Sequence, residues 1–160
     1  MPNNLQPAAL DPVDRLILAK LDEDARIPNN ALAEAVGIAP STCHARVRAL
    51  RANGVIRGFH ADLDLGAIGL AVQAMISVRL HAHTRGQMDA FLAKAPLMPG
   101  VIAVYFMSGT DDYVIHVALP SADVLRDFVL DLSSEPAVQH TNTSLIFESR
   151  RGKAIPTQRT

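Results

Sequence analysis

The chain has 160 residues, 49% of them hydrophobic and 19% charged, which is enough apolar material for one medium-sized domain or two small ones. This composition excludes a wholly disordered chain, and the single cysteine excludes an internal disulfide. The sequence shows neither a signal-peptide pattern nor an apolar run of membrane length, so we expect a cytoplasmic protein with no membrane partner.

The net charge of −1 conceals three regions of different sign. Residues 40–60 hold four arginines and no acidic residue, residues 62–148 hold four basic and ten acidic residues, and residues 149–160 hold four basic residues. A basic patch, an acidic body and a basic tail fit a protein that binds nucleic acid. Solvated surface charge is the alternative explanation.

Three helices are predicted in residues 10–61, after an N-terminal arm (residues 1–9) that is rich in Pro and Asn and expected to be disordered. Asp11 suits the N-cap of the first helix, and an asparagine, Asn29 or Asn30, is expected to cap the second. Gly37 is expected to end the second helix in a left-handed conformation. The first helix carries an apolar stripe at helical spacing, formed by Val13, Leu16, Ile17 and Leu21.

The third predicted helix, within residues 40–54, is short and basic. Its apolar side, formed by Cys43, Val47 and Leu50, is expected to face the other helices. Small residues between arginines let such a helix approach the major groove of DNA, and a basic helix after a tight turn predicts a helix-turn-helix element. The predicted DNA-binding residues are Arg46 and Arg48, toward bases or phosphates, Ser41 and Thr42, toward phosphates, and His44, Ala45, Arg51 and Arg57.

Residues 55–61 are expected to form a short strand pair, which would make residues 10–61 a winged helix-turn-helix domain. A small helical domain with a solvated basic face is the alternative. Cys43 is interpreted as a small core residue and not as a catalytic thiol, because His44 points about 100° away around the helix.

Residues 62–70 change composition, carry two glycines and are interpreted as a linker. Residues 71–149 are predicted to form a strand, a helix, two strands, a helix and a strand. The strands are predicted at 72–80, 101–107, 113–119 and 138–148. The first helix begins near a capping box of Thr84 with Gln87, and the second begins near Pro120-Ser121. This βαββαβ order predicts an α+β, ferredoxin-like domain with both helices on one face of an antiparallel sheet.

The other face of the predicted sheet needs a cover. Val72, Ala74, Ile76 and Val78 could serve one face, while Met75 with Tyr105 or Met107 would line the other. A second copy of the same sheet is the obvious cover. A dimer would also supply two reading heads for two DNA half-sites.

Across residues 10–149 the chain resembles the Lrp/AsnC family of leucine-responsive and asparagine-responsive regulators. The resemblance rests on LDPVDRLILAKLDEDARI and LAEAVGIAPSTCHARVRALRANGVIRGFHADLD in the first domain, and on MPGV and SGTDDY in the second. It implies a nucleoid-associated transcription regulator, not an enzyme, with a winged DNA-binding domain, a ferredoxin-like (RAM-type) effector domain and no cofactor. It further implies a homodimer on a palindromic double-stranded DNA operator, assembly up to an octamer, and an amino acid as the effector.

The segment SGTDDY matches the family's effector loop, whose common pattern is Gly-Asp-x-Asp-Tyr. Thr110 stands where the first Asp usually lies, which leaves the effector's identity open. A turn containing glycine offers backbone N–H groups to a carboxylate, and Asp112 could answer an α-ammonium group. A bare hairpin turn is the alternative. The predicted effector-binding residues are Met107, Ser108, Gly109, Thr110, Asp111, Asp112 and Tyr113.

Two other functions stay open: an architectural DNA-binding protein that ignores effectors, and a small-molecule enzyme built on the ferredoxin-like domain. The enzyme is disfavoured because that domain has no cysteine and no recognisable nucleophile–base pair. His81 and His83 could share one strand face, but no third metal ligand follows at recognisable spacing. The tail, residues 150–160, is expected to be basic and solvated.

Overall fold

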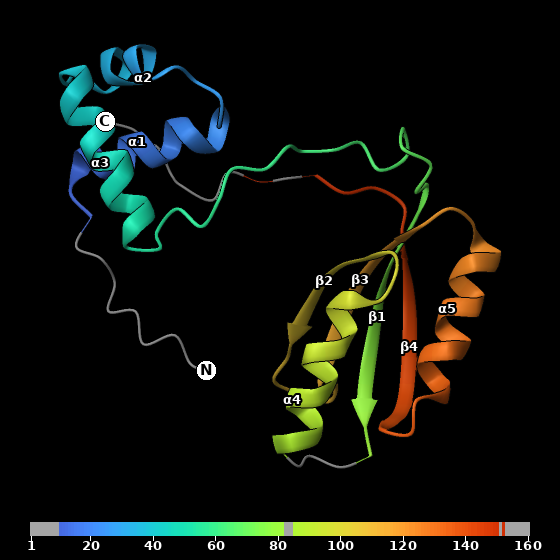
Figure 1. Ribbon diagram of the computed structural model, residues 1–160. Helices are drawn as coiled ribbons and strands as arrows, with labels where there is room; N and C mark the ends of the chain where they lie inside the picture. Colours follow the sequence, from blue (N-terminus) through green and yellow to red (C-terminus); the bar gives the residue numbers. More distant parts are fainter. Residues whose placement is uncertain (1–9, 82–84, 151, 153–160) are drawn as a thin grey trace. The chain divides into compact units, whose positions relative to one another are not determined.

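The computed structural model describes residues 10–81, 85–150 and 152, and Figure 1 shows its helices and strands. The described residues form two compact units, residues 10–62 and residues 63–150. The predicted N-terminal arm, the predicted cap at Thr84, His83 and nearly all of the basic tail lie outside the described residues. No helix in the described part of the chain is long and apolar enough to cross a membrane.

The first unit consists of the predicted three helices, α1 (Pro12–Glu23), α2 (Asn29–Val36) and α3 (Pro40–Ala52). The N-cap prediction for Asp11 is confirmed, since its Oδ1 accepts a hydrogen bond of 2.8 Å from the backbone N–H of Asp14. Gly37 ends α2 with φ of 73°, in the left-handed region that favours glycine, as predicted.

The predicted asparagine cap of α2 is wrong. The N-cap is Pro28, which makes no side-chain cap, and Asn29 is already the first helical residue. The amide of Asn29 instead donates a hydrogen bond of 2.9 Å to the carbonyl oxygen of Pro40. This contact ties the start of α2 to the start of α3, a long-range use of the side chain that a local capping rule does not anticipate.

The helical core forms around Ile17 and Cys43, both fully buried, with Leu32 and Leu50 beside them. The apolar side predicted for α3 is therefore confirmed. The stripe predicted for α1 is only partly right, because the side chain of Leu16 is 45% exposed. The other three predicted residues pack in the core, Ile17 fully buried and Val13 and Leu21 partly buried against it.

The predicted strand pair at residues 55–61 does not form; these residues contain no strand in the structure. The N–H groups of Val55 and Ile56 both donate to the carbonyl oxygen of Leu50, at 2.9 and 3.1 Å. The start of the segment therefore caps the C-terminus of α3. The few residues that follow form too short a segment for a β-hairpin.

The second unit has the predicted order of elements, β1 (Val72–Leu80), α4 (Arg85–Lys94), the 3₁₀ turn η1 (Ala95–Leu97), β2 (Val101–Phe106), β3 (Tyr113–Leu119), α5 (Ala122–Ser134) and β4 (Val138–Ile146). The strands form one antiparallel sheet in the order β2-β3-β1-β4 (Figure 1). This is the predicted ferredoxin-like arrangement, in which the two inner strands, β1 and β3, are not consecutive in the chain.

One face of the sheet packs against both helices. Ile76 of β1 and its partner Ile115 of β3 are fully buried in one core with Phe91 of α4 and Leu132 of α5. Alternation along the strands places the neighbouring residues on the opposite face, which we call the open face. Met75 lies there, half-buried between its strand neighbours, and Tyr105 is 48% exposed. The division of the faces follows the prediction.

Candidate DNA-binding and effector-binding sites

The outer face of α3 is small and basic. Ser41, Ala45 and Arg48 are exposed along it, and Thr42, His44 and Arg51 flank them with exposed side chains. Small side chains at the front allow a close approach of the helix backbone to a nucleic-acid groove, and the arginine supplies paired donors for phosphates or guanine edges. Six of the eight predicted DNA-binding residues thus share one accessible surface.

Arg51, at the edge of this surface, has a further contact, and Arg57 lies outside the surface. The guanidinium of Arg51 lies 5.9 Å from the ring centre of Phe59, within cation–π range. Arg57 lies beyond α3, in the irregular segment after it, and is exposed. Both keep their charge at the surface, where it can attract phosphates.

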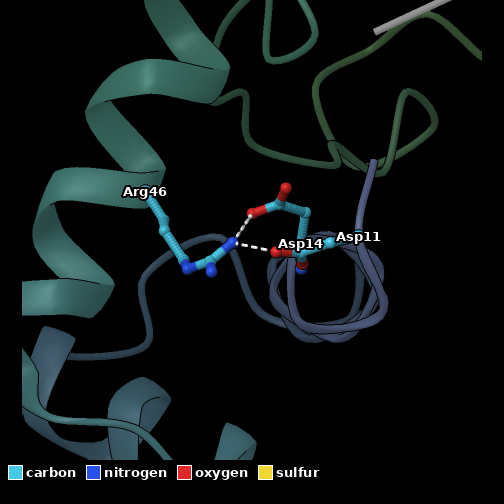
Figure 2. Close-up of polar contacts among 3 residues, drawn as sticks. All are labelled: Asp11, Asp14 and Arg46. Carbon is cyan, nitrogen blue, oxygen red and sulfur yellow. Dashed lines mark hydrogen bonds and ion pairs between the residues drawn. The ribbon is translucent and has the colours of Figure 1, made fainter. Parts of the chain in front are cut away.

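Arg46 differs from every other predicted DNA-binding residue, because its guanidinium points from α3 to the N-terminus of α1 (Figure 2). Its Nη1 donates to Asp11 Oδ2 at 2.5 Å and to Asp14 Oδ1 at 2.8 Å. These two carboxylates raise the pKa of Arg46, and the hydrogen bond to Asp14 is the largest single cause. The sequence analysis missed both acidic partners. The available signal was the presence of two aspartates at the start of α1, of which the cap needs only Asp11.

The predicted effector loop is the hairpin between β2 and β3. The N–H of Met107 donates to the carbonyl oxygen of Asp112 at 2.9 Å and closes the hairpin. Gly109 at its tip has φ of 132°, a conformation that L side chains rarely adopt. Ser108, Gly109 and Thr110 are exposed, so their backbone groups are accessible to a ligand.

The last two predicted effector-binding residues hold the fold together. Asp112 Oδ2 accepts a hydrogen bond of 2.8 Å from the N–H of Leu80, and the N–H of Asp112 donates to the carbonyl oxygen of Val78 at 2.9 Å. Tyr113 is 1% exposed, and its hydroxyl donates to the carbonyl oxygen of Met88 at 3.0 Å. Binding of an ammonium group by Asp112 stays a prediction, but the carboxylate has a structural contact that the sequence did not reveal.

Other polar groups offer little chemistry. Burial raises the pKa of the Cys43 thiol, which disfavours the reactive thiolate. Among residues 10–81 and 85–150, no three His, Cys, Asp or Glu side chains gather as they would around a metal ion. The two surfaces described above are therefore the candidates for function.

Comparison with known proteins decides the class. A model of the Lrp/AsnC ligand-binding domain matches residues 73–153, and a model of winged helix-turn-helix DNA-binding domains matches residues 10–57. The chain belongs to the Lrp/AsnC family. Members of this family are transcriptional regulators that bind DNA and respond to ligands, and they are not enzymes.

Individual relatives agree over nearly the whole chain. The HTH-type transcriptional regulator AldR of Mycolicibacterium smegmatis is 52% identical over 152 residues, which cover 94% of this chain and 89% of the relative. The crystal structure of Mycobacterium tuberculosis AldR has a TM-score of 0.80 at 46% identity and covers 94% of this chain and 100% of the other. A Neisseria meningitidis regulator solved as an L-Met complex has a TM-score of 0.83 at 28% identity, covering 92% and 96%.

Proposed function

We propose that this Lrp/AsnC regulator senses an amino acid at the β2–β3 hairpin and binds a palindromic operator as a homodimer through paired α3 helices. The observation that carries the proposal is the exposed small and basic face of α3, formed around Ala45 and Arg48, in a chain whose second unit matches a ligand-binding domain. As a DNA-binding regulator, the protein would act at the nucleoid in the cytoplasm.

The hairpin supports an amino-acid effector in two ways. Its tip exposes the backbone around Gly109, and such N–H groups suit a carboxylate. A relative of the same fold was solved as a complex with L-Met. The effector can change operator affinity only if it binds one assembly state more tightly than another, so we propose that it shifts a dimer toward or away from a larger oligomer, up to an octamer.

A thermal-shift screen with the twenty amino acids tests effector binding. At least one should raise the melting temperature, because a ligand that binds only the folded state stabilises it. Gly109→Ala should weaken that shift, since an alanine is strained at φ of 132°. Gly86→Ala, at an exposed helical position with open space around it, is the matched control and should retain the shift. No shift with any amino acid would favour an architectural, effector-independent protein.

Light scattering and gel shifts with the identified amino acid then test regulation. We expect the average mass, the affinity for DNA selected by the protein from a random-sequence pool, or both to change. A ligand that stabilises the protein but changes neither quantity would contradict the proposed link between the effector and DNA binding.

A further inference from the structure

Arg46 is paired with two carboxylates although it lies on α3, the helix proposed to bind DNA. Its side chain is 33% exposed, and its two partners, Asp11 and Asp14, belong to a helix more than thirty residues earlier in the chain. Figure 2 shows the guanidinium directed at the pair of carboxylates. Arg48, two residues later, is exposed.

Each of the two carboxylates has restricted freedom apart from its contact with Arg46. Asp11 uses its Oδ1 to cap α1 and its Oδ2 to accept from Arg46, so the capping bond holds the carboxylate in orientation. Asp14 is one turn inside the same helix, and its side chain is only 16% exposed. The two aspartate side chains therefore lose little conformational entropy when they bind Arg46.

The position of Arg46 along α3 allows this contact to control the orientation of the helix. It lies at the middle of the helix, with the core residues Cys43 three positions before it and Leu50 four positions after it. Apolar packing tolerates small rotations of a helix, whereas charge-assisted hydrogen bonds to two carboxylates are directional. Such bonds restrict the rotation of α3 about its axis, and a binding surface needs its side chains held within about 10–20° of the productive orientation.

We propose that Arg46 is a positioning residue that fastens α3 to α1 and sets the angle at which α3 presents Arg48 to DNA, and that it contacts neither bases nor phosphates. This rests on the DNA-binding function of the family and revises the role expected for Arg46 from the sequence. Operator recognition then depends on Asp11 and Asp14, two acidic residues that an electrostatic argument alone would class as unfavourable to DNA binding.

Neutralising Asp14 distinguishes a positioning role of Arg46 from a direct contact with DNA, because the two roles predict opposite changes in DNA affinity. If Arg46 positions α3, Asp14→Asn lowers affinity for DNA selected by the wild-type protein by about tenfold, comparable to the cost of one mismatched base pair. If Arg46 contacts DNA, the same change weakens the hold of α1 on the arginine and removes a negative charge, and affinity rises. Glu34→Gln, which neutralises an exposed acidic residue on α2, is the control and should leave affinity unchanged or raise it slightly.

Arg46→Ala provides the second measurement. We expect it to lower affinity for selected DNA by about tenfold while the slope of log affinity against log salt stays near the wild-type value, because no phosphate contact is lost. Affinity for random DNA should change by less than about threefold. Partial unfolding would instead reduce binding to both DNAs equally, so their ratio distinguishes mispositioning from loss of folded protein.

The double variant Asp14→Asn/Arg46→Ala completes a cycle. Residues that act as one unit give a combined loss close to that of Arg46→Ala alone. Additive losses, a tighter-binding Asp14→Asn variant, or a salt slope reduced by about one in Arg46→Ala would each overturn the proposal. A wild-type protein that selects no DNA from the pool would contradict the proposed operator binding itself, which is a different failure.

Discussion

Arg48 is the residue that we expect to contribute most to direct contact with DNA. It is exposed on the outer face of α3, where the exposed side chains of Ala45, Ala49 and Ala52 are small. Replacing it with alanine should weaken binding to selected DNA by about 1–3 kcal/mol, the usual value of a good arginine contact, and should lower the salt slope if the contact is to a phosphate. Gel shifts across a salt series measure both quantities.

The melting temperature of the Arg48→Ala variant should equal that of the wild type, because an exposed side chain contributes little to the core. Arg126→Ala, on α5, removes an exposed arginine that pairs only with neighbouring aspartates and serves as the control. Equal DNA affinities for Arg48→Ala and Arg126→Ala would contradict the assignment of Arg48.

Asp11 makes the stability of the helical unit depend on pH. The backbone N–H of Asp14, followed by the guanidinium of Arg46, holds the pKa of Asp11 below its ordinary value of 3.8. Because the folded-state pKa is the lower one, the carboxylate stabilises the fold above pH 3.8, and this contribution is lost as pH falls through the folded-state value.

The Asp11→Asn variant should therefore lose less melting temperature than the wild type over the acid range below about pH 4. Asparagine keeps most of the capping function, so the comparison isolates the charge. Circular dichroism melts at a series of pH values measure the difference, with Glu34→Gln expected to follow the wild type. Parallel profiles for Asp11→Asn and wild type would show that the ion pair does not stabilise the fold.

At the scale of single residues, sequence analysis succeeded where the cause is local. The cap at Asp11 and the left-handed Gly37 depend on neighbours within a few positions, and both were predicted correctly. Arg46 was correctly placed on the flank of α3. The direction in which its long side chain turns depends on where α1 lies, which no spacing rule within α3 supplies.

Among the elements, the β2–β3 hairpin is tied to β1 through Asp112. Its carboxylate accepts from the N–H of Leu80 at the point where the pairing of β1 with β4 shifts register. Asp112→Ala would leave that N–H without its acceptor and should lower the free energy of unfolding by about 1–3 kcal/mol in the absence of any ligand. Chemical denaturation measures the change. Asp111→Ala is the neighbouring control, and equal stability of the two variants would leave Asp112 with a ligand-binding role alone.

The turn into β2 depends on Gly100. Its φ is 82°, and a Cβ there would lie 2.4 Å from Leu119 Cδ2 and 3.0 Å from the carbonyl oxygen of Ala118. Gly100→Ala should therefore destabilise the second unit by about 2 kcal/mol or more, from backbone strain together with the clash. Gly86→Ala has open space and a helical backbone, so it should be neutral or stabilising by up to about 1 kcal/mol. Denaturant midpoints of both variants test the contrast.

The elements predicted best are those in which the hydrophobic pattern ends where turn-forming residues begin. β1 and β3 were predicted with the observed bounds, because alternation of apolar residues coincides with turn residues at the strand ends. The strand pair after α3 was wrong because Val55 and Ile56, which have strand propensity, give their N–H groups to the helix end. Strand propensity does not predict whether a backbone N–H group bonds to a neighbouring strand or to the end of a helix.

At the scale of the whole molecule, the open face of the sheet is the feature that a single copy leaves unexplained. Met75 is paired with His116 of β3 and Ser144 of β4 there, and Gln73 lies beside His116, with 3.2 Å between Oε1 and Nε2. Burial lowers the pKa of His116, so its ring tends to be neutral. Apolar and neutral polar groups of this kind suit contact with a second copy better than a charged face would.

An aspartate at position 75 tests whether this face joins two copies. Met75→Asp would place a charge at the centre of the open face of each copy, where burial between sheets costs several kcal/mol. We expect sedimentation to show a monomer that remains folded by circular dichroism. Affinity for selected DNA should fall by about a hundredfold although α3 is unchanged. A monomer has one α3 helix and cannot bind two half-sites at the same time. Ala90→Asp, at an exposed position of α4, adds the same charge outside the face and should stay dimeric. A dimeric Met75→Asp variant with normal DNA affinity would place the contact between copies on another surface.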